Sequence, residues 1–472
     1  MDILVKNGSL KPKQNHGIIP YMYIKQVRAL SDIFFKEYGH PPRMFIQTFG
    51  CQMNDRESEK LHGLLLAMGY AEGKSEEEAD LVLYNTCCVR EAAENKVYGK
   101  LGYLKAYKAS MPGKIIVFCG CMPQRKEVMA EINRHHRHID IIFGTFNKHH
   151  FPRLLYEYLQ HRKPVIEILE DYPEAASDEY NGQAARFLPH KAGIVVMHGC
   201  DNYCSYCIVP YVRGREVSRK PEEVMAEIKA LVSDGVKEIM LLGQNVNSYA
   251  YGFAELIKRV NDTPGLKRIR FMTSHPKDLS QNLIDAIRDC DLVCKHIHLP
   301  MQAGSDKILK AMNRGYTKAQ YLDLTARLRR DVPGIAITTD IIVGFPGEDE
   351  EDFEHTLDAV RKSGFAGAFT FLYSHRDGTP AANLTCEVAR EAAKNRFDRL
   401  VKLLNPMQLA HNKRYLGRKV LVMADKDSSG RTGDNVPVHF EADKNIIPGD
   451  MVEVSIEECK TFYIKGKLVP AP

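Results

Sequence analysis

The sequence predicts an α/β protein with three structured parts: a parallel-sheet domain, a second α/β domain and a small C-terminal β-barrel. The first observation is that short apolar strand segments alternate with helical patterns over 43–160, which favours a parallel sheet covered by helices. The second is that the same alternation resumes over 187–406. The third is that short strands separated by Gly, Asp and Asn turns fill 407–472, as is typical of a small antiparallel barrel.

Bulk composition limits the classes of protein that fit. A chain of 472 residues is too long for one ordinary domain. No apolar run approaches the roughly 18 residues that a membrane span needs, and the N-terminus lacks the apolar core of a secretory signal. We therefore expect a cytoplasmic protein with no membrane partner. The net charge of +5 permits a nucleic-acid partner without demanding one, and the 12 cysteines of such a chain indicate metal binding or catalysis more than disulfides.

The first α/β domain follows an extension, 1–42, for which we expect helix only around 23–39. The helix after its first strand is expected to begin with Asn54 as the N-cap. A polar, acidic and poorly periodic stretch, 161–186, is predicted to be a linker. The expected strands are 44–49, 80–86, 114–120 and 138–144.

The second α/β domain has six predicted β/α units, fewer than the eight of a full barrel, so an open barrel and a doubly wound sheet both fit. Its expected strands are 193–199, 237–243, 268–274, 295–300, 336–345 and 365–374. Its expected helices are 221–235, 305–315 with Ser305 as N-cap, and 351–364, which closes at Gly364. The expected strands of the C-terminal barrel are 418–427, 436–443, 450–460 and 461–469.

Three cysteines, Cys200, Cys204 and Cys207, follow the first strand of the second domain with the spacing C-x3-C-x2-C. Chance would give such a triplet only roughly 0.01 times. A structural zinc site needs a fourth ligand, and His190 and His198 do not follow a zinc-ribbon spacing. A redox dithiol would leave Cys200 idle. A three-cysteine iron–sulfur cluster with one open iron fits best, because such clusters normally take four thiolates; structural zinc is the main alternative.

A second set of thiols follows three strands of the first domain: Cys51, then Cys87 and Cys88, then Cys119 and Cys121. Because the carboxyl ends of parallel strands meet at one edge of a sheet, thiols distant in sequence can converge there. We expect Cys119 to share a strand face with Cys121, since side chains repeat every second residue. The alternative is that these are ordinary buried apolar cysteines.

The loop "CDNYCSYC" resembles that of the radical S-adenosylmethionine (SAM) enzymes. With the upstream thiols, the chain from Arg43 to Leu468 resembles the methylthiotransferases. This resemblance implies an N-terminal cluster domain, a partial (β/α)6 radical-SAM barrel and a C-terminal TRAM RNA-binding barrel, with two 4Fe–4S clusters and two SAM molecules per turnover. The implied cluster ligands are Cys51, Cys87, Cys121, Cys200, Cys204 and Cys207, and Cys88 and Cys119 stay open as substitutes.

Three stretches, "LLGQNVNSY" (241–249), "TSHP" (273–276) and "HLPMQAGSD" (298–306), look like the MiaB type, which makes 2-methylthio-isopentenyladenosine next to the tRNA anticodon. The implied partners are a tRNA anticodon stem-loop with a prenylated adenosine, a reductant such as flavodoxin or ferredoxin, and a sulfur donor or cluster-repair protein. Methylthiotransferases acting on threonylcarbamoyladenosine in tRNA, or on a ribosomal protein, stay as alternatives. A non-catalytic Fe–S protein that binds RNA or transfers electrons is the alternative from another class.

Candidate cofactor contacts lie at strand ends and beside the cysteine loop. His275 is a candidate substrate contact, although a lone loop histidine is more often solvated. The stretch 343–348 has an equal alternative as an ordinary strand-to-helix turn. Two stretches near the C-terminus interleave basic and aromatic residues, as single-strand RNA binders do, although a basic run is more often a solvated face. The candidate SAM contacts are Tyr206, which in the family lies near the adenine, Gln244, Asn245, Ser274, Gln302, Gly344, Pro346 and Gly347; the candidate RNA contacts are Lys413, Arg414, Lys419 and Lys465.

Overall fold

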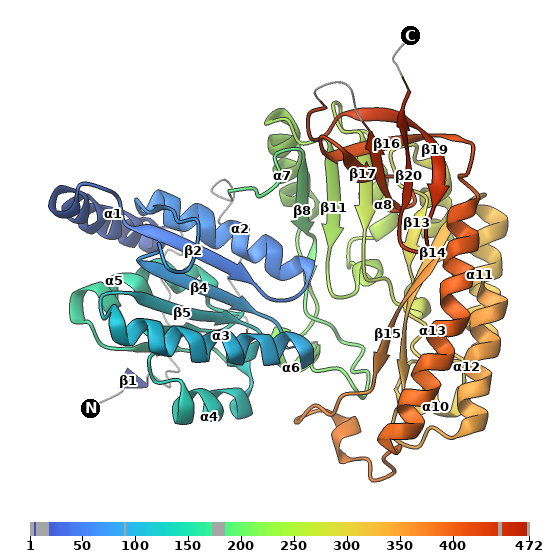
Figure 1. The fold of residues 1–472 in the computed structure, drawn as a ribbon, viewed down its shortest axis with the longest axis horizontal. Helices are drawn as coiled ribbons and strands as arrows, with labels where there is room; N and C mark the ends of the chain where they lie inside the picture. The colour runs from blue at the N-terminus through green and yellow to red at the C-terminus, as the bar shows by residue number, and fades with distance from the viewer. Residues whose placement is uncertain (1–3, 6–17, 89–90, 172–184, 442–445, 470–472) are drawn as a thin grey trace. The chain divides into compact units, whose positions relative to one another are not determined.

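The computed structural model describes residues 4–5, 18–88, 91–171, 185–441 and 446–469 (Figure 1). The chain divides into two compact units. Unit 1 comprises Met1–Phe187 and Ile208–Arg215, and unit 2 comprises Leu188–Cys207 and Glu216–Pro472. The segment 208–215 therefore belongs to unit 1, although it directly follows the last cysteine of the triplet. None of the helices in the described ranges is long and apolar enough to cross a membrane.

Unit 1 is built on a seven-stranded sheet in the order β1-β7-β6-β5-β4-β2-β3, with all neighbouring strands parallel. The central strands β4 and β5 are buried at every residue, which explains their continuous apolar runs. The strands are β1 (Leu4–Val5), β2 (Arg43–Thr48), β3 (Ala71–Glu72), β4 (Leu81–Thr86), β5 (Ile115–Gly120), β6 (Ile141–Phe143) and β7 (Val165–Glu167).

Helices cover both faces of this sheet. Helices α1, α2 and α5 bury Val27, Leu64 and Leu154 against one face, whereas α3 and α4 bury Leu101 and Val128 against the other. Because α2 and α3 lie on opposite faces, the chain reverses between β2 and β4, and ligands of such sheets bind at this switch point, beyond the carboxyl ends of the strands. The helices are α1 (Ile18–Tyr38), α2 (Gln52–Ala67), α3 (Glu91–Ser110), α4 (Lys126–His135), α5 (Phe151–His161) and α6 (Val209–Arg213), with 3-10 turns η1 (Met122–Gln124) and η2 (Lys148–His150).

Three predictions about unit 1 are wrong in detail. The extension is more ordered than expected, because α1 begins at Ile18 and β1 pairs with β7. The predicted linker 161–186 is not wholly irregular, since it contains β7; its residues 172–184 lie outside the described ranges. Helix α2 begins at Gln52 with Cys51 as its N-cap instead of Asn54, because the Asn54 side chain is buried and donates to the carbonyl oxygen of Thr86 at 2.8 Å.

The core of unit 2 has six parallel strands in two three-stranded sheets, β8-β11-β12 and β13-β14-β15. A parallel bridge between Ile269 and Val293 connects β12 to the segment before β13. The strands therefore follow chain order, as in an open (β/α) barrel, without the reversal that a doubly wound sheet requires. The strands are β8 (Lys191–Val195), β11 (Glu238–Leu242), β12 (Arg268–Phe271), β13 (His296–His298), β14 (Ala336–Val343) and β15 (Gly367–Leu372), and a short antiparallel ribbon joins β9 (Met197–His198) to β10 (Val217–Ser218).

Helices follow the core strands of unit 2 as predicted. Helix α10 has Ser305 as its N-cap, and α12 ends at Gly364 in a left-handed conformation. Helix α7 packs into the core through Val224 and Ile228. The helices are α7 (Pro221–Ser233), α8 (Phe253–Asn261), α9 (Gln281–Asp289), α10 (Asp306–Ala311), α11 (Lys318–Asp331) and α12 (Glu350–Ser363), with 3-10 turns η3 (Val246–Ser248), η4 (Pro276–Asp278) and η5 (Pro380–Asn383).

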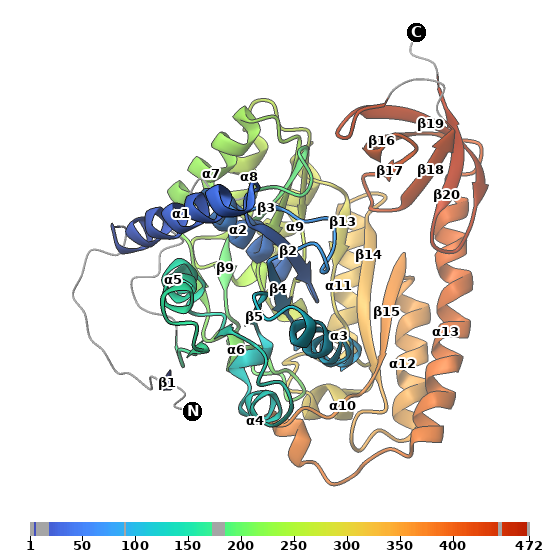
Figure 2. The same ribbon diagram turned by 60° about the vertical axis from the view of Figure 1, so that its left-hand side comes forward.

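The C-terminal part of unit 2 is a closed barrel of five strands that follows the long helix α13 (Arg390–Lys413) (Figure 2). The predicted antiparallel barrel needs one correction: β18 and β20 pair in parallel. An odd number of strands cannot alternate direction all the way around a closed ring, so one pair must be parallel. The predicted boundary at 406/407 falls inside α13. The strands are β16 (Lys419–Lys426), β17 (Ser429–Arg431), which was not predicted, β18 (Pro437–Glu441), β19 (Met451–Cys459) and β20 (Ile464–Leu468).

Candidate functional site

Three adjacent strands of unit 1 each lead into a cysteine. Cys51 follows β2, Cys87 follows β4 and Cys121 follows β5. Gly50 has φ +143°, and a Cβ at this position would lie 2.2 Å from the Cβ of Cys87, so only glycine allows this close approach. The amide of Cys121 donates to the carbonyl oxygen of Thr86 at 2.8 Å. The backbone thus brings the three thiols to one edge of the sheet.

The two neighbouring thiols lie in different environments. Cys119 packs with residues of α1, α2 and α5, whereas Cys88 and Cys121 belong to the core on the opposite face of the sheet. The prediction that Cys119 shares a face with Cys121 is wrong, because β5 ends at Gly120 and Cys121 has helical dihedral angles (φ −76°, ψ −30°), so the strand alternation stops between them. Cys88 is buried and forms a hydrogen bond with Cys121, so it lies beside a candidate ligand.

A buried polar network beside these thiols was not predicted from the sequence. Arg213, the last residue of α6, donates to Glu57 Oε1 and to Asn54 Oδ1, each at 2.9 Å. The Cys51 thiol donates to the same Asn54 oxygen at 3.3 Å. Lys148 also pairs with Glu57. The network therefore places two cations and one carboxylate close to the first candidate ligand.

This environment favours the thiolate form. A hydrogen bond from Cys87 and the charge of Arg213 lower the pKa of Cys51 to about 6. A hydrogen bond from Cys88 and the same arginine lower the pKa of Cys121. Since the thiolate is the form that binds metal, the donor set fits an iron–sulfur cluster ligated by three cysteines.

The second thiol set, Cys200, Cys204 and Cys207, lies on a loop after β9 in unit 2. The side-chain amide of Asn313 donates to the carbonyl oxygens of Asn202 and Tyr203, at 3.2 and 3.0 Å. Ser205 likewise bonds the C-terminal end of α10: its amide donates to the carbonyl oxygen of Met312, and its hydroxyl donates to that of Ala311. The turn between α10 and α11 therefore holds the cysteine loop from one side.

Two side chains donate hydrogen bonds to sulfur atoms of this loop. The Asn202 amide lies 3.4 Å from Cys200 Sγ, and Arg314 Nη1 lies 3.2 Å from Cys204 Sγ. Burial raises the pKa of Cys200 to about 11. This raised pKa is compatible with a cluster ligand, because a metal deprotonates a coordinating thiol outright.

Three candidate SAM contacts carry buried side-chain oxygens that have no hydrogen-bond partner among the described residues: Gln244 Oε1, Ser274 Oγ and Gln302 Oε1. They follow β11, β12 and β13, so they share the carboxyl edge of the strands. His275 is buried, not solvated; its Nδ1 accepts from the Lys277 amide at 3.3 Å, and its Nε2 is also unpartnered within the described chain. Because buried polar atoms are normally paired, these atoms fit a polar ligand such as SAM.

Two further candidates, Asn245 and Gly344, make contacts within the protein. The Asn245 side chain donates to Asp278 at 2.8 Å and accepts from the His275 amide at 3.2 Å. Gly344 has φ +77°, and a Cβ there would lie 2.8 Å from the Cβ of Ala393 on α13. Hydrogen bonds within the protein thus account for the Asn245 side chain, and turn geometry and packing account for the glycine at position 344.

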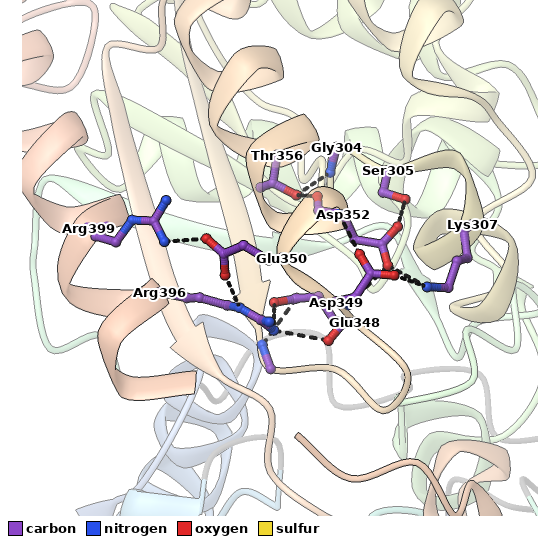
Figure 3. A network of polar contacts seen from close by, with 11 residues as sticks. Gly304, Ser305, Lys307, Glu348, Asp349, Glu350, Asp352, Thr356, Arg396 and Arg399 are labelled. Atoms are coloured by element: carbon purple, nitrogen blue, oxygen red, sulfur yellow. Dashed lines mark hydrogen bonds and ion pairs between the residues drawn. The ribbon is translucent and has the colours of Figure 1, made fainter. Parts of the chain in front are cut away.

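The stretch 343–348 is a turn whose polar groups are bonded internally. The amide of Gly344 donates to Glu348 Oε2 at 3.1 Å, and that of Gly347 donates to the carbonyl oxygen of Cys386 at 2.7 Å. Figure 3 shows Arg396 of α13 pointing at Glu348, with Nη1 3.0 Å from its Oε1. Burial raises the pKa of Glu348 to about 7. These contacts favour the alternative of a structural turn, and Pro346 is buried within it.

Tyr206 is half-buried between the cysteine loop and a small apolar cluster that includes Phe345 and Met312. Its hydroxyl lies 3.4 Å from Arg314 Nη1. The ring is therefore fixed beside the loop.

The four candidate RNA contacts are exposed on the barrel and at the end of α13. Three of them lie within 4 Å of an acidic side chain: Arg414 of Asp434 (3.7 Å), Lys419 of Glu453 (3.9 Å) and Lys465 of Glu458 (3.6 Å). Lys413, the fourth, ends α13. A side chain that sequence reasoning did not single out, Phe462, is 62 % exposed between β19 and β20. It offers an open aromatic ring three residues before Lys465 in the sequence.

Zinc, the alternative for the triplet, receives no support from the geometry. Among the described residues, no three His, Cys, Asp or Glu side chains are placed to hold a single metal ion. His190 precedes β8 and lies 3.6 Å from Asp425, so it is at the opposite end of that strand from the triplet. Thiolates of an iron–sulfur cluster bind different irons and need not converge on one point.

Comparison with known proteins first defines the class. Residues 194–360 match the Radical SAM superfamily, and residues 43–144 match the Uncharacterized protein family UPF0004. The solved structure of the radical SAM methyltransferase TsrM from Kitasatospora setae aligns with a TM-score of 0.51 at 14 % identity, covering 72 % of this chain and 74 % of that chain. The chain is thus a radical-SAM protein with an additional N-terminal domain.

Full-length relatives then define the family. The tRNA-2-methylthio-N(6)-dimethylallyladenosine synthase of Acetivibrio thermocellus is 48 % identical over 97 % of this chain and 99 % of its own length. That of Alkaliphilus oremlandii is 45 % identical over 96 % and 98 %. The chain belongs to this family of radical-SAM methylthiotransferases, which confirms the predicted family and fold class.

Proposed function

We propose that this chain inserts a methylthio group at carbon 2 of isopentenyladenosine next to the anticodon of tRNA. The observation that carries the proposal is the pair of three-cysteine sets, each at the carboxyl ends of strands, together with the unpartnered polar atoms of Gln244, Ser274 and Gln302. A protein that only transferred electrons or bound RNA would have no need for these unpartnered polar atoms. The names of the relatives support the choice of substrate.

Cys51, Cys87 and Cys121 would hold one 4Fe–4S cluster, and Cys200, Cys204 and Cys207 the other. Three thiolates leave one of the four irons open in each case. When bound, the clusters and SAM supply one-electron chemistry, which is needed because general acid–base catalysis contributes only about 10²–10⁴-fold and cannot activate a purine C–H bond.

The residues around the second cysteine set have separate tasks in this proposal. The polar groups of SAM form hydrogen bonds with the side chains of Gln244, Ser274 and Gln302. His275 stays neutral at physiological pH, because burial and the charge of Arg314 lower its pKa to about 2. Its Nδ1 accepts from a backbone amide, so Nε2 carries the proton and can donate to a bound ligand. The Tyr206 ring lies near the adenine of the bound SAM.

The remaining parts of the chain receive assignments consistent with this function. We assign 43–160 as the N-terminal cluster domain, 187–413, up to the end of α13, as the radical-SAM core and 414–472 as the TRAM domain that binds RNA. Lys413, Arg414, Lys419 and Lys465 would contact the phosphates of the anticodon stem-loop. The reaction also requires a one-electron reductant such as flavodoxin or ferredoxin and a source of sulfur, in the cytoplasm where tRNA is modified.

The test uses a bacterial strain without its own methylthiotransferase, complemented with this chain. Mass spectrometry of digested tRNA is expected to show 2-methylthio-isopentenyladenosine, and a triple Cys200→Ala, Cys204→Ala, Cys207→Ala variant is expected to show only isopentenyladenosine. Methylthiolation of threonylcarbamoyladenosine or of a ribosomal protein instead would refute the substrate. Purified protein with dithionite and SAM must release 5′-deoxyadenosine; its absence would favour a non-catalytic Fe–S protein.

A further inference from the structure

Arg314, after α10, is a buried cation that has no anionic side chain beside it among the described residues. It is 4 % exposed. Its guanidinium donates to the Pro300 carbonyl oxygen at 2.9 Å, the Tyr316 hydroxyl at 3.0 Å, Cys204 Sγ at 3.2 Å and the Tyr206 hydroxyl at 3.4 Å. None of these partners is a carboxylate.

Five other buried arginines of the described chain differ in this respect. A buried charge is unfavourable unless an opposite charge compensates for it, and these arginines follow that rule. Each pairs with a carboxylate at about 3 Å: Arg125 with Glu94, Arg213 with Glu57, Arg219 with Glu227, Arg270 with Glu238 and Arg396 with Glu348. Arg268 resembles Arg314 in donating to backbone carbonyl oxygens, but of these described arginines only Arg314 donates to a cysteine sulfur, so an anionic group bound at the cysteine loop would compensate its charge.

We infer that Arg314 is the fixed counter-charge of the cluster held by Cys200, Cys204 and Cys207, acting through Cys204 Sγ as a positioning residue. This inference rests on the proposed function, because it requires a thiolate-ligated cluster at this loop. One-electron reduction adds one negative charge to the cluster, with the electron taken from a donor such as flavodoxin or dithionite. A fixed positive charge beside a ligand sulfur favours the reduced form and raises the reduction potential.

The test measures the potential of this one cluster in the full-length chain with Cys51, Cys87 and Cys121 changed to alanine. Redox titration followed by electron paramagnetic resonance compares the parent, Arg314→Met and Arg314→Lys. We expect Arg314→Met to shift the reduction equilibrium at least tenfold toward the oxidised form, which is about 59 mV for a one-electron couple. Arg314→Lys keeps the charge and is expected to shift it less.

Arg268→Met is the matched control. Arg268 is also a buried guanidinium that donates to carbonyl oxygens, those of Leu421 and Arg431, and it lies on β12 away from the cysteine loop. We expect it to leave the potential unchanged. An unchanged potential in Arg314→Met, or an equal shift in Arg268→Met, would overturn the inference.

A second measurement applies if Arg314→Met retains too little iron for titration. Thermal midpoints are compared with and without iron, because binding to the folded state raises the midpoint. If Arg314 is a counter-charge, the increase in the thermal midpoint on iron loading shrinks in Arg314→Met. The same increase persists in Arg314→Lys and Arg268→Met. If Arg314→Met lowers the thermal midpoint equally in the iron-loaded and iron-free states, the role of Arg314 is merely structural. A parent chain that binds no iron at this loop would instead refute the proposed function itself.

Discussion

The side-chain oxygen of Asn54 accepts two hydrogen bonds, one from the Cys51 thiol and one from Arg213. This single atom connects a candidate cluster ligand to a buried ion-pair network. Glu57 is the only carboxylate that Arg213 contacts directly in the described chain, and it also pairs with Lys148. The stability of the first turn of α2 therefore depends on one buried anion between two cations.

Replacing Glu57 by glutamine tests this dependence. Arg213 and Lys148 would lose their anion, and breaking a buried pair in this way costs about 3–5 kcal/mol. We expect that decrease in the free energy of unfolding of unit 1 in the iron-free chain, measured with urea near pH 7. Glu157→Gln, which breaks a half-buried helical pair with Arg153, serves as the control and should cost about 0–1 kcal/mol.

We also expect the stability difference between the parent and Glu57→Gln to depend on pH. Although burial opposes ionisation, Arg213 and Lys148 lower the pKa of Glu57 to about 2 in the folded chain, below the value of about 4.3 for an unperturbed glutamate. A depressed pKa contributes stability above the unfolded value and loses it as the pH falls toward the folded value. The difference between parent and Glu57→Gln should therefore shrink between about pH 4.3 and pH 2; a difference that stays constant over this range would contradict the assignment.

The opposite environments of Cys119 and Cys121 give a second prediction. In a chain that lacks the 200–207 thiols, Cys121→Ala should abolish iron binding after anaerobic reconstitution. Cys119→Ala should retain it, because this thiol packs against the helices on the other face of the sheet. Iron per chain is measured by colorimetric assay. Retention of a full cluster by Cys121→Ala would show that Cys88, its hydrogen-bonded neighbour, can replace it.

The thiols could be predicted from the sequence, but the charges around them could not. Strand ends and the C-x3-C-x2-C spacing single out eight candidate cysteines, because both features are local in the chain, whereas the choice of six ligands among them rests on the family resemblance. Arg213 and Arg314 are recognisable only from contacts made by tertiary folding, since no spacing relates them to Asn54 or Cys204. The predicted role of Asn54 as a helix cap was wrong for the same reason: its local sequence suits a cap, but its side chain is bonded across the sheet to Thr86.

At the scale of elements, the strands that carry the site were predictable because they are apolar, buried and bounded by glycine or polar residues. All the strands of the second core were anticipated within a few residues. The strands that were not predicted, β1, β3, β7, β10 and β17, have two or three residues each. Such short segments carry no periodicity and exist only because a neighbouring strand supplies their hydrogen bonds.

The turn between β14 and α12 gives a prediction about an element. Gly344→Ala places a Cβ in the left-handed region, which costs about 1–2 kcal/mol, and 2.8 Å from Ala393, where overpacking costs about 1–3 kcal/mol more. We expect a clear fall in the urea midpoint of unit 2. Gly347→Ala is the control, since its φ is +82° but no atom lies within 4 Å of the added Cβ. Equal effects of the two substitutions would show that helix α13 does not constrain the turn.

At the scale of the whole molecule, the C-terminal barrel is part of the structure of unit 2. Arg268 donates to the carbonyl oxygens of Leu421 and Arg431, and Arg270 donates to those of Thr432 and Gly433. Deleting the barrel would leave both guanidinium groups of the core without these acceptors. A truncated chain would therefore lose stability together with any RNA binding, so point substitutions are the cleaner test of the barrel's role.

Phe462→Ala is the substitution that tests RNA binding by the barrel. The exposed ring can stack on an unpaired base, and such stacking is worth about 1–3 kcal/mol per base. We expect weaker binding of an anticodon stem-loop by that amount, measured by fluorescence anisotropy with the loaded protein. Lys465→Gln should also weaken binding and reduce the slope of log K against log salt by about 1, as the loss of one phosphate contact predicts.

Ile447→Ala provides the control for this last prediction, because Ile447 is an exposed apolar residue of the same part of the chain without an aromatic ring. It should bind the stem-loop like the parent. All three variants should retain iron and release 5′-deoxyadenosine from SAM at the parental rate, since none of them touches a cysteine loop. Unchanged RNA affinity in both Phe462→Ala and Lys465→Gln would place the RNA contact outside the turn between β19 and β20, because base stacking and phosphate pairing are the two interactions that this surface offers.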